Sequence, residues 1–247
     1  MTEFLDQICE PKGLIVAWQS SDLRGENRYR YAIGVVNPLD ATFRYFRPGP
    51  EFSEHNQGRD YSETEALGYR GYPAFDRSQD LHTTGVMEAL MRRLPPRTRS
   101  DFDAYAARFL LPPSRTLSDV TLLGRTEATL PSDGFSVVDP LDPTIDHCDL
   151  LLEVAGFRHY ADKVSLTGGQ SIGVIADPGN PFDRNAVEFR AGTAKFGNVN
   201  RLQAATFRHW LNVADVHARV ERLNGTPARP RVFVLVTVRP RVNALAA

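Results

Sequence analysis

Cysteine, lysine and long apolar runs are all scarce in this chain of 247 residues. Cys9 and Cys148 are the only cysteines, too few and too widely spaced for a disulfide framework or a pair of zinc ligands at standard spacing. No stretch approaches the roughly 18 consecutive apolar residues of a transmembrane helix, and the acidic N-terminus has no basic region leading into an apolar run. We therefore expect a soluble, cytoplasmic protein without a membrane partner.

Signatures of common enzyme classes are also missing. The sequence has no Gly-x-x-x-x-Gly-Lys-Ser/Thr phosphate loop, no Gly-x-Ser-x-Gly elbow and no His-Glu-x-x-His motif. A glutamate two residues before a lysine, as in a common nuclease fold, occurs only at Glu10 and Lys12, before the first predicted strand, where a metal site would have little scaffold. We expect no catalytic residue, no cofactor and no bound metal.

One acidic segment leaves an alternative open. Six side chains between residues 51 and 65 are potential ligands of a hard cation: Glu51, Glu54, His55, Asp60, Glu63 and Glu65. A solvated loop is the simpler interpretation of such a cluster. The alternative is a metal-dependent nuclease site, or nuclease accessory, that the C-terminal half positions.

Charge divides the chain into two unlike parts. Residues 1–149 hold 16 Lys+Arg and 23 Asp+Glu, whereas residues 150–247 hold 13 and 7, which gives net charges of −7 and +6. Only the C-terminal part is therefore suited to a polyanion, although the same charge spread evenly over a small domain would be unremarkable. The 26 arginines against 3 lysines fit the coding bias of a G+C-rich genome as well as they fit phosphate recognition.

The N-terminal part reads as an α+β domain over residues 1–142. Short apolar runs predict an antiparallel meander of three strands at residues 14–18, 29–36 and 43–46. Residues 47–80 read mostly as a loop that aromatic side chains pin down: Tyr61, Tyr69, Tyr72 and Phe75.

Two helices should follow that loop. The first starts at Thr84 or Gly85 and stops at the prolines 95–96, and the second is capped by Ser100 and ends at the prolines 112–113. Residues 114–149 are acidic and rich in turn formers, so we place the domain boundary near residues 140–149.

The C-terminal part, residues 150–240, reads as many short strands around one helix. Strands are predicted at 150–158, 171–176, 186–190, 194–199, 217–222 and 231–238. The helix runs from about Arg201 to Leu211, with Asn200 as its N-cap and Leu202, Ala205 and Trp210 available to the core. This spacing of strands predicts a small β-barrel.

The most informative stretch is Asn-Pro-Phe-Asp-Arg-Asn-Ala-Val at residues 180–187. Pro181 fixes one φ angle, and the Asn and Asp side chains bond nearby backbone, which predicts a rigid turn before a strand. Turn geometry alone would explain the asparagines, with Phe182 folded onto the core. An exposed Phe182 would instead offer a stacking platform for a nucleic-acid base.

Three stretches together resemble the HIRAN domain over roughly residues 150–238. They are Gly-Phe-Arg-His-Tyr at 156–160, Asp-Pro-Gly-Asn-Pro-Phe-Asp-Arg-Asn-Ala-Val at 177–187, and Gly-Asn-Val-Asn-Arg-Leu at 197–202. Their order and the Asn-Pro-aromatic-Asp-x-Asn-Ala core carry the resemblance. Residues 68–76, Gly-Tyr-Arg-Gly-Tyr-Pro-Ala-Phe-Asp, are similar to the companion region of bacterial stand-alone HIRAN proteins.

The resemblance implies an OB-like barrel that captures the 3′ end of single-stranded DNA. Arg158 and Arg201 would then hold phosphates, His159 and Phe182 would sandwich the terminal base, and Asp183 would accept a hydrogen bond from the 3′-hydroxyl. Tyr160 is the alternative to His159 as the stacking ring. A characterised member of the family has tyrosine at the positions of both His159 and Phe182, so two phenol hydroxyls are lost here.

We therefore predict a non-enzymatic, two-domain bacterial protein whose C-terminal domain binds DNA ends. The family's fusions to helicases and nucleases imply that the chain recruits such repair, restriction or defence enzymes in trans. An adaptor that binds proteins in a phage- or plasmid-related system is the alternative from another class. DNA against RNA preference and oligomeric state stay open at this point.

Overall fold

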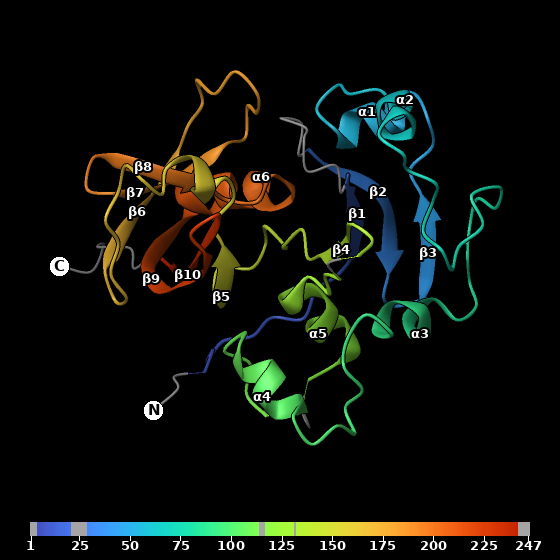
Figure 1. The fold of residues 1–247 in the computed structure, drawn as a ribbon, viewed down its shortest axis with the longest axis horizontal. Coiled ribbons are helices and arrows are strands. Elements are labelled where there is room, and N and C mark those ends of the chain that lie inside the picture. Colours follow the sequence, from blue (N-terminus) through green and yellow to red (C-terminus); the bar gives the residue numbers. More distant parts are fainter. Residues whose placement is uncertain (1–3, 21–28, 114–116, 131, 242–247) are drawn as a thin grey trace. The chain divides into compact units, whose positions relative to one another are not determined.

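A computed structural model describes residues 4–20, 29–113, 117–130 and 132–241 (Figure 1). Contacts divide the chain into an N-terminal unit, Glu10–Phe109 with Pro113–Pro140, and a C-terminal unit, Met1–Cys9, Leu110–Pro112 and Leu141–Ala247. The start of the chain thus packs with the C-terminal unit, whereas the sequence assigned it to the N-terminal domain. The Asp149 carboxylate explains this, because it accepts hydrogen bonds from the backbone N–H groups of Asp6, at 3.2 Å, and Gln7, at 3.0 Å.

The N-terminal unit is built on an antiparallel sheet with the strand order β3-β2-β1-β4. The strands are β1 (Leu14–Gln19), β2 (Arg30–Asn37), β3 (Thr42–Tyr45) and β4 (Phe135–Val138). The predicted meander is confirmed as β1 to β3 (Figure 1). β4 was missed, since it lies in the stretch whose turn formers dominated the sequence pattern.

Short helices surround this sheet in the chain order. They are α1 (Pro50–His55), α2 (Tyr61–Ala66), α3 (Val86–Met91), α4 (Phe102–Ala107) and α5 (Asp119–Thr126). The predicted loop at residues 47–80 is wrong for α1 and α2. Pro50 starts α1, and Asp60 and Glu63 form a capping box for α2, so both helices had start signals in the sequence. Asp101, not Ser100, is the N-cap of α4.

Aromatic side chains fix the segment between α2 and α3. Tyr69, Tyr72 and Phe75 are buried, as the sequence analysis expected of the residues that pin this segment. The Tyr45 hydroxyl accepts a hydrogen bond from the Tyr72 N–H at 3.0 Å and donates one to the Phe75 carbonyl at 2.9 Å. Burial raises the pKa of Tyr45 to about 12, so this hydroxyl keeps its proton at neutral pH.

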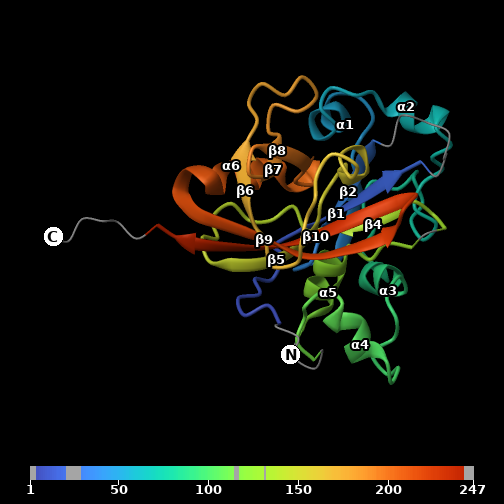
Figure 2. The same cartoon turned by 60° about the vertical axis from the view of Figure 1, so that its left-hand side comes forward.

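The C-terminal unit contains a six-stranded antiparallel sheet with the order β5-β10-β9-β6-β7-β8. Its strands are β5 (Cys148–Glu153), β6 (Ser171–Ala176), β7 (Val187–Ala191), β8 (Ala194–Asn198), β9 (Ala214–Thr226) and β10 (Arg229–Pro240). Figure 2 shows β9 and β10 as a long hairpin. A short 3₁₀ helix, η2 (Phe157–His159), follows β5, and α6 (Arg201–Val213) follows β8.

The predicted barrel is not closed by strand pairing in the described residues. β6 pairs with β9 only at Ser171 and Ile172 and with β7 from Gly173 onward, so the sheet changes partner along one strand. Its edge strand β8 meets the chain beyond β5 through one isolated bridge, Ala155 to Asn198. Gly156, at φ 76°, then turns the chain into η2, which ends the pairing after that bridge.

The C-terminal core lies between the sheet and α6. Phe189, Phe196, Phe207 and Trp210 are fully buried there. The prediction that Trp210 faces the core is confirmed, but the predicted core residue Ala205 is exposed and Leu202 is half-buried. None of the helices that the structure describes is long and apolar enough to cross a membrane.

Candidate nucleic-acid interface

The first segment of the candidate site is η2, which replaces the last part of the strand predicted at 150–158. Its Arg158 and His159 side chains are exposed, and Arg158 Nε donates a hydrogen bond to His159 Nε2 at 3.1 Å. Tyr160 is half-buried and packs against the hydrophobic core. Of the two candidate stacking rings, His159 is therefore the one presented to solvent.

The second segment is the loop at residues 177–186, which the sequence predicted as a rigid turn. Asn180 Oδ1 accepts hydrogen bonds from the backbone N–H groups of Phe182, at 3.0 Å, and Asp183, at 3.2 Å. Asp183 Oδ1 in turn accepts from the Asn185 N–H at 2.8 Å. The Asp177 N–H donates to the Ala186 carbonyl at 2.8 Å, so the loop is closed at its base.

Phe182 stands out at the tip of this loop. The residue is 84% exposed, whereas a phenylalanine that served only the turn would fold onto the core. The two hydrogen bonds to Asn180 hold the backbone on both sides of the ring's attachment point. The arrangement is a preformed platform, with the Asp183 carboxylate on the next residue.

A polar network ties the loop to the sheet behind it. Asn180 Nδ2 donates to Asp177 Oδ2 at 3.0 Å, and Lys195 Nζ lies 3.7 Å from that oxygen. Lys195 also pairs with the buried Glu188 at 3.2 Å. Because Glu188 lies on β7 and Lys195 on β8, the network holds the loop in one position relative to both strands.

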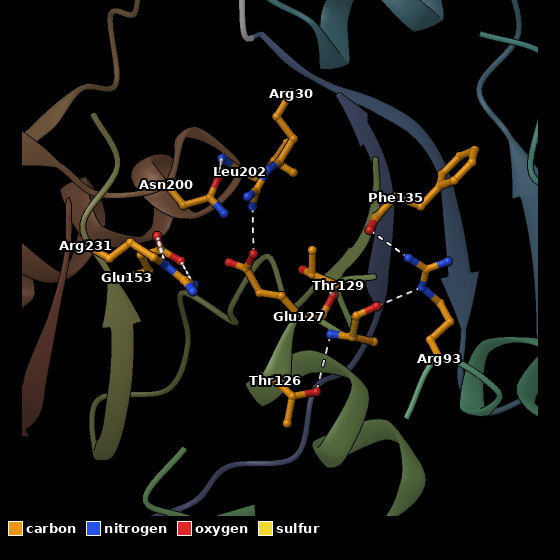
Figure 3. A network of polar contacts seen from close by, with 11 residues as sticks. Arg30, Arg93, Thr126, Glu127, Thr129, Phe135, Glu153, Asn200, Leu202 and Arg231 are labelled. Carbon is orange, nitrogen blue, oxygen red and sulfur yellow. Dashed lines mark hydrogen bonds and ion pairs between the residues drawn. The ribbon is translucent and has the colours of Figure 1, made fainter. Parts of the chain in front are cut away.

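The third segment is the start of α6. Asn200 caps the helix, and its side-chain oxygen accepts from the Leu202 N–H at 3.2 Å, as the sequence predicted (Figure 3). Arg201, the first helical residue, is half-buried. The helix has no acidic residue over its 13 positions, so the positive end of its dipole adds to the guanidinium charge there.

Backbone hydrogen bonds bring the three segments to one end of the sheet. Ala155 and Asn198 exchange N–H···O bonds of 2.8 and 2.9 Å, three residues before Arg158 and Arg201 respectively. The Val199 N–H donates to the Val187 carbonyl at 2.8 Å, directly after the loop. η2, the loop and the α6 N-terminus therefore start from neighbouring backbone positions.

Gly197 makes this approach possible. A Cβ atom there would lie 2.2 Å from Val154 Cγ1 and 2.8 Å from the Ala155 carbonyl oxygen. No other residue type fits without moving the chain that leads into η2. Gly197, which the sequence analysis placed in the third motif stretch, thus serves the packing of the first stretch against β8.

Two arginines next to these segments were not among the predicted site residues. Arg208 Nη1 donates to the backbone carbonyl of Arg184, which connects α6 to the loop. Arg184 is exposed and stands inside the motif itself, and Arg208 lies two helical turns after Arg201. Helical periodicity from Arg201 was the signal that could have identified Arg208.

The acidic cluster at residues 51–65 is occupied by partners within the N-terminal unit. Glu51 pairs with Arg44 at 2.7 Å, Glu63 with Arg59 at 2.7 Å, and Glu65 with Arg77 at 2.9 Å. Asp60 caps α2, and the His55 ring stacks on Phe46. Within the described part of the chain, no group of three His, Cys, Asp or Glu side chains is placed to hold a metal ion.

Comparisons with known proteins give little beyond this geometry. No family model matches the chain. No curated protein matches it either. Among solved structures, the HIRAN domain of human HLTF is similar over 36% of this chain and 74% of its own, at 19% identity and a TM-score of 0.32. A protein from Lactobacillus plantarum is similar over 37% of this chain and 99% of its own, at 19% identity and a TM-score of 0.29. Likenesses this low carry no argument about function here.

Proposed function

We propose that the C-terminal unit binds single-stranded DNA at its 3′ end and catalyses no reaction. The observation that carries this proposal is the Phe182 ring, 84% exposed on a turn that is already formed without a ligand. Arg158 and His159 are exposed on a segment that the Ala155–Asn198 bridge anchors beside the same end of the sheet. The sequence resemblance to the HIRAN family supplies the choice of ligand.

Each site residue has a role in this proposal. Phe182 and His159 stack on the two faces of the terminal base, where each stacking contact contributes about 1–3 kcal/mol. Arg158 and Arg201 bind phosphate oxygens, the latter with help from the α6 N-terminus. Tyr160 contributes indirectly, since its packing against the core holds η2 in place.

Asp183 gives the proposal its specificity. One carboxylate oxygen accepts the Asn185 N–H, and the second is assigned the 3′-hydroxyl as donor. A 3′-phosphate at that place would bring a second negative charge to hydrogen-bond distance of the carboxylate, which is unfavourable. We therefore expect a 3′-hydroxyl strand to bind more tightly than the same strand with a 3′-phosphate.

The test is fluorescence anisotropy with strands labelled at the 5′ end that carry a 3′-hydroxyl, a 3′-phosphate or a blocked 3′ end. The unaltered protein should prefer the hydroxyl about tenfold or more, and Asp183→Asn should reduce this preference because the carboxylate charge is gone. Arg158→Ala should weaken all three strands alike. Equal affinity of the unaltered protein for all three ends would remove end recognition.

The same titration separates DNA binding from the adaptor alternative. Each phosphate contact contributes about −0.7 to the slope of log affinity against log salt for single strands. Contacts from Arg158 and Arg201 should give a slope of about −1.4 or steeper. A protein that only bridges other proteins would show no strand binding at any salt concentration. Recruitment of a helicase or nuclease in trans is the further part of this proposal, and a pull-down with DNA ends present and absent tests it.

A further inference from the structure

We propose that the β9–β10 hairpin carries a second DNA contact, which binds the phosphodiester backbone of the captured strand on the 5′ side of its end. This inference rests on the proposed function. The name "basic arm" is used here for residues 219–231, the part of the hairpin at and next to its turn. The arm is proposed to bind charge along the strand, independently of base identity.

The composition of the basic arm fits a polyanion. Four arginines and one acidic residue lie in these 13 positions: Arg219, Arg222, Arg229, Arg231 and Glu221. The two strands pair with each other up to Thr226 and Arg229, whereas the neighbouring strands reach only Arg219 on β9 and Phe233 on β10. The arm therefore extends beyond the rest of the sheet, with both edges of its ribbon available.

Two of these arginines share one aromatic ring. The guanidinium carbons of Arg222 and Arg231 lie 4.4 and 5.1 Å from the centroid of Phe233, which is buried beneath them. Arg231 also forms two hydrogen bonds with the Glu153 carboxylate (Figure 3). Stacking fixes both cations on the same face of the ribbon, which lowers the entropy that a phosphate contact would cost.

The two cations repel each other at this distance. Burial, together with the charge of Arg231, lowers the pKa of Arg222, and Glu221 offsets part of the effect. An anion bound between them would relieve that repulsion. Arg229, near the turn, is exposed and forms no ion pair within the described residues.

The basic arm is continuous with the candidate site. The Val154 N–H donates to the Val232 carbonyl at 3.0 Å, next to Arg231, and η2 packs against β10. Arg158 follows four residues after Val154. A strand whose last phosphates lie at Arg158 and Arg201 thus has further guanidinium groups close to hand along β10, where the backbone can continue.

A length series with matched ends tests the inference. Strands of about 3 and about 12 nucleotides bracket the lower and upper parts of the range that one OB-type domain covers. The variant Arg222→Gln with Arg229→Gln should bind the long strand about tenfold more weakly and with a salt slope smaller by about 1.4. Its affinity for the short 3′-hydroxyl strand should stay unchanged, because that strand fills only the end site.

The control removes the same charge elsewhere. Arg70 and Arg92 are exposed on the N-terminal unit, and Arg70→Gln with Arg92→Gln should leave both strands unaffected. An equal loss in this control would overturn the inference, since net charge alone would then explain the effect. Unchanged binding of the long strand by the arm variant would overturn it too, while the 3′-hydroxyl preference of the unaltered protein would keep the proposed function. If the unaltered protein binds neither strand, the proposed function fails first.

Discussion

The two units use arginine in opposite ways. In the N-terminal unit, arginines pair with carboxylates across the fold, and two of these pairs are largely buried: Arg93 with Asp133 and Arg125 with Asp139. In the C-terminal unit, Arg158, Arg184, Arg208 and Arg229 form no ion pair within the residues that the structure describes. The same side chain is a structural partner in one unit and a surface cation in the other.

The count of acidic residues explains this difference. Residues 1–149 hold 23 Asp+Glu for 16 Lys+Arg, so each arginine there meets a surplus of carboxylates, whereas residues 150–247 hold 7 for 13. An abundance of arginine therefore says little about phosphate binding until its local partners are known. The following experiments test the comparison, from the largest expected effect to the smallest.

Arg93→Ala should destabilise the N-terminal unit by about 3 kcal/mol. The side chain donates to the carbonyls of Ala128 and Phe135 and to both oxygens of Asp133, and its removal leaves buried acceptors without donors (Figure 3). Urea denaturation followed by tryptophan fluorescence measures the change. The exposed neighbour Arg92→Ala should shift stability by less than about 0.5 kcal/mol, and a similar cost for both would contradict the internal role of Arg93.

Gly197→Ala should disrupt the C-terminal site. The added methyl group would overlap Val154 and the Ala155 carbonyl, so we expect a loss of about 1–3 kcal/mol of stability and displacement of η2. Strand binding should fall even under conditions where the variant is folded. Gly168→Ala is the matched control, since its Cβ would lie 3.6 Å from the nearest listed neighbour, the Glu221 carbonyl oxygen. Normal binding by folded Gly197→Ala protein would show that η2 is not part of the site.

Phe182→Ala separates binding from folding. Because the ring is 84% exposed, its removal should change the free energy of unfolding by less than about 0.5 kcal/mol. Loss of the stacking platform should weaken single-strand binding by about 1–3 kcal/mol. Phe182→Tyr, which keeps the ring and restores the family's hydroxyl, should bind at least as well as the unaltered protein. Loss of stability without loss of binding would assign the ring to the fold.

Glu51→Gln tests the acidic side of the comparison. The Arg47 backbone N–H, aided by Arg44, holds the pKa of Glu51 below its usual value, although burial opposes this. A lowered pKa stabilises the folded state above the unfolded-state pKa of about 4.3, and this contribution disappears as the pH falls through the lower folded-state pKa. The substitution should cost about 0.5 kcal/mol at neutral pH and nothing at the acidic end, as urea midpoints across pH would show.

The sequence predicted most of the sheet strands, because alternating apolar runs such as residues 14–18 and 231–238 have few other interpretations. It also predicted the turn at Asn180 and the cap at Asn200, since both depend on local side-chain chemistry. It failed for α5 and β4, whose burial depends on packing within a stretch that local turn formers dominate.

The site was predicted only in part. Exposure of Phe182 was one of two open outcomes in the sequence, because a tight turn permits either direction for its ring. The 3₁₀ turn at Arg158 was missed, since Gly156 ends the strand through a left-handed conformation that a run of residues does not reveal. The bridge between Ala155 and Asn198 joins residues 43 positions apart, which no local pattern encodes.

The divided pairing of β6 also bears on how the molecule opens. The hairpin of β7 and β8, with the recognition loop at its start, is attached to β9 by two residue pairs of β6 and to the chain after β5 by one bridge. Such a unit should exchange its amide protons sooner than the continuous β5-β10-β9 ladder. A ligand that spans both parts would slow this exchange, so deuterium uptake at β6 and β8 would record occupancy of the site without any label on the DNA.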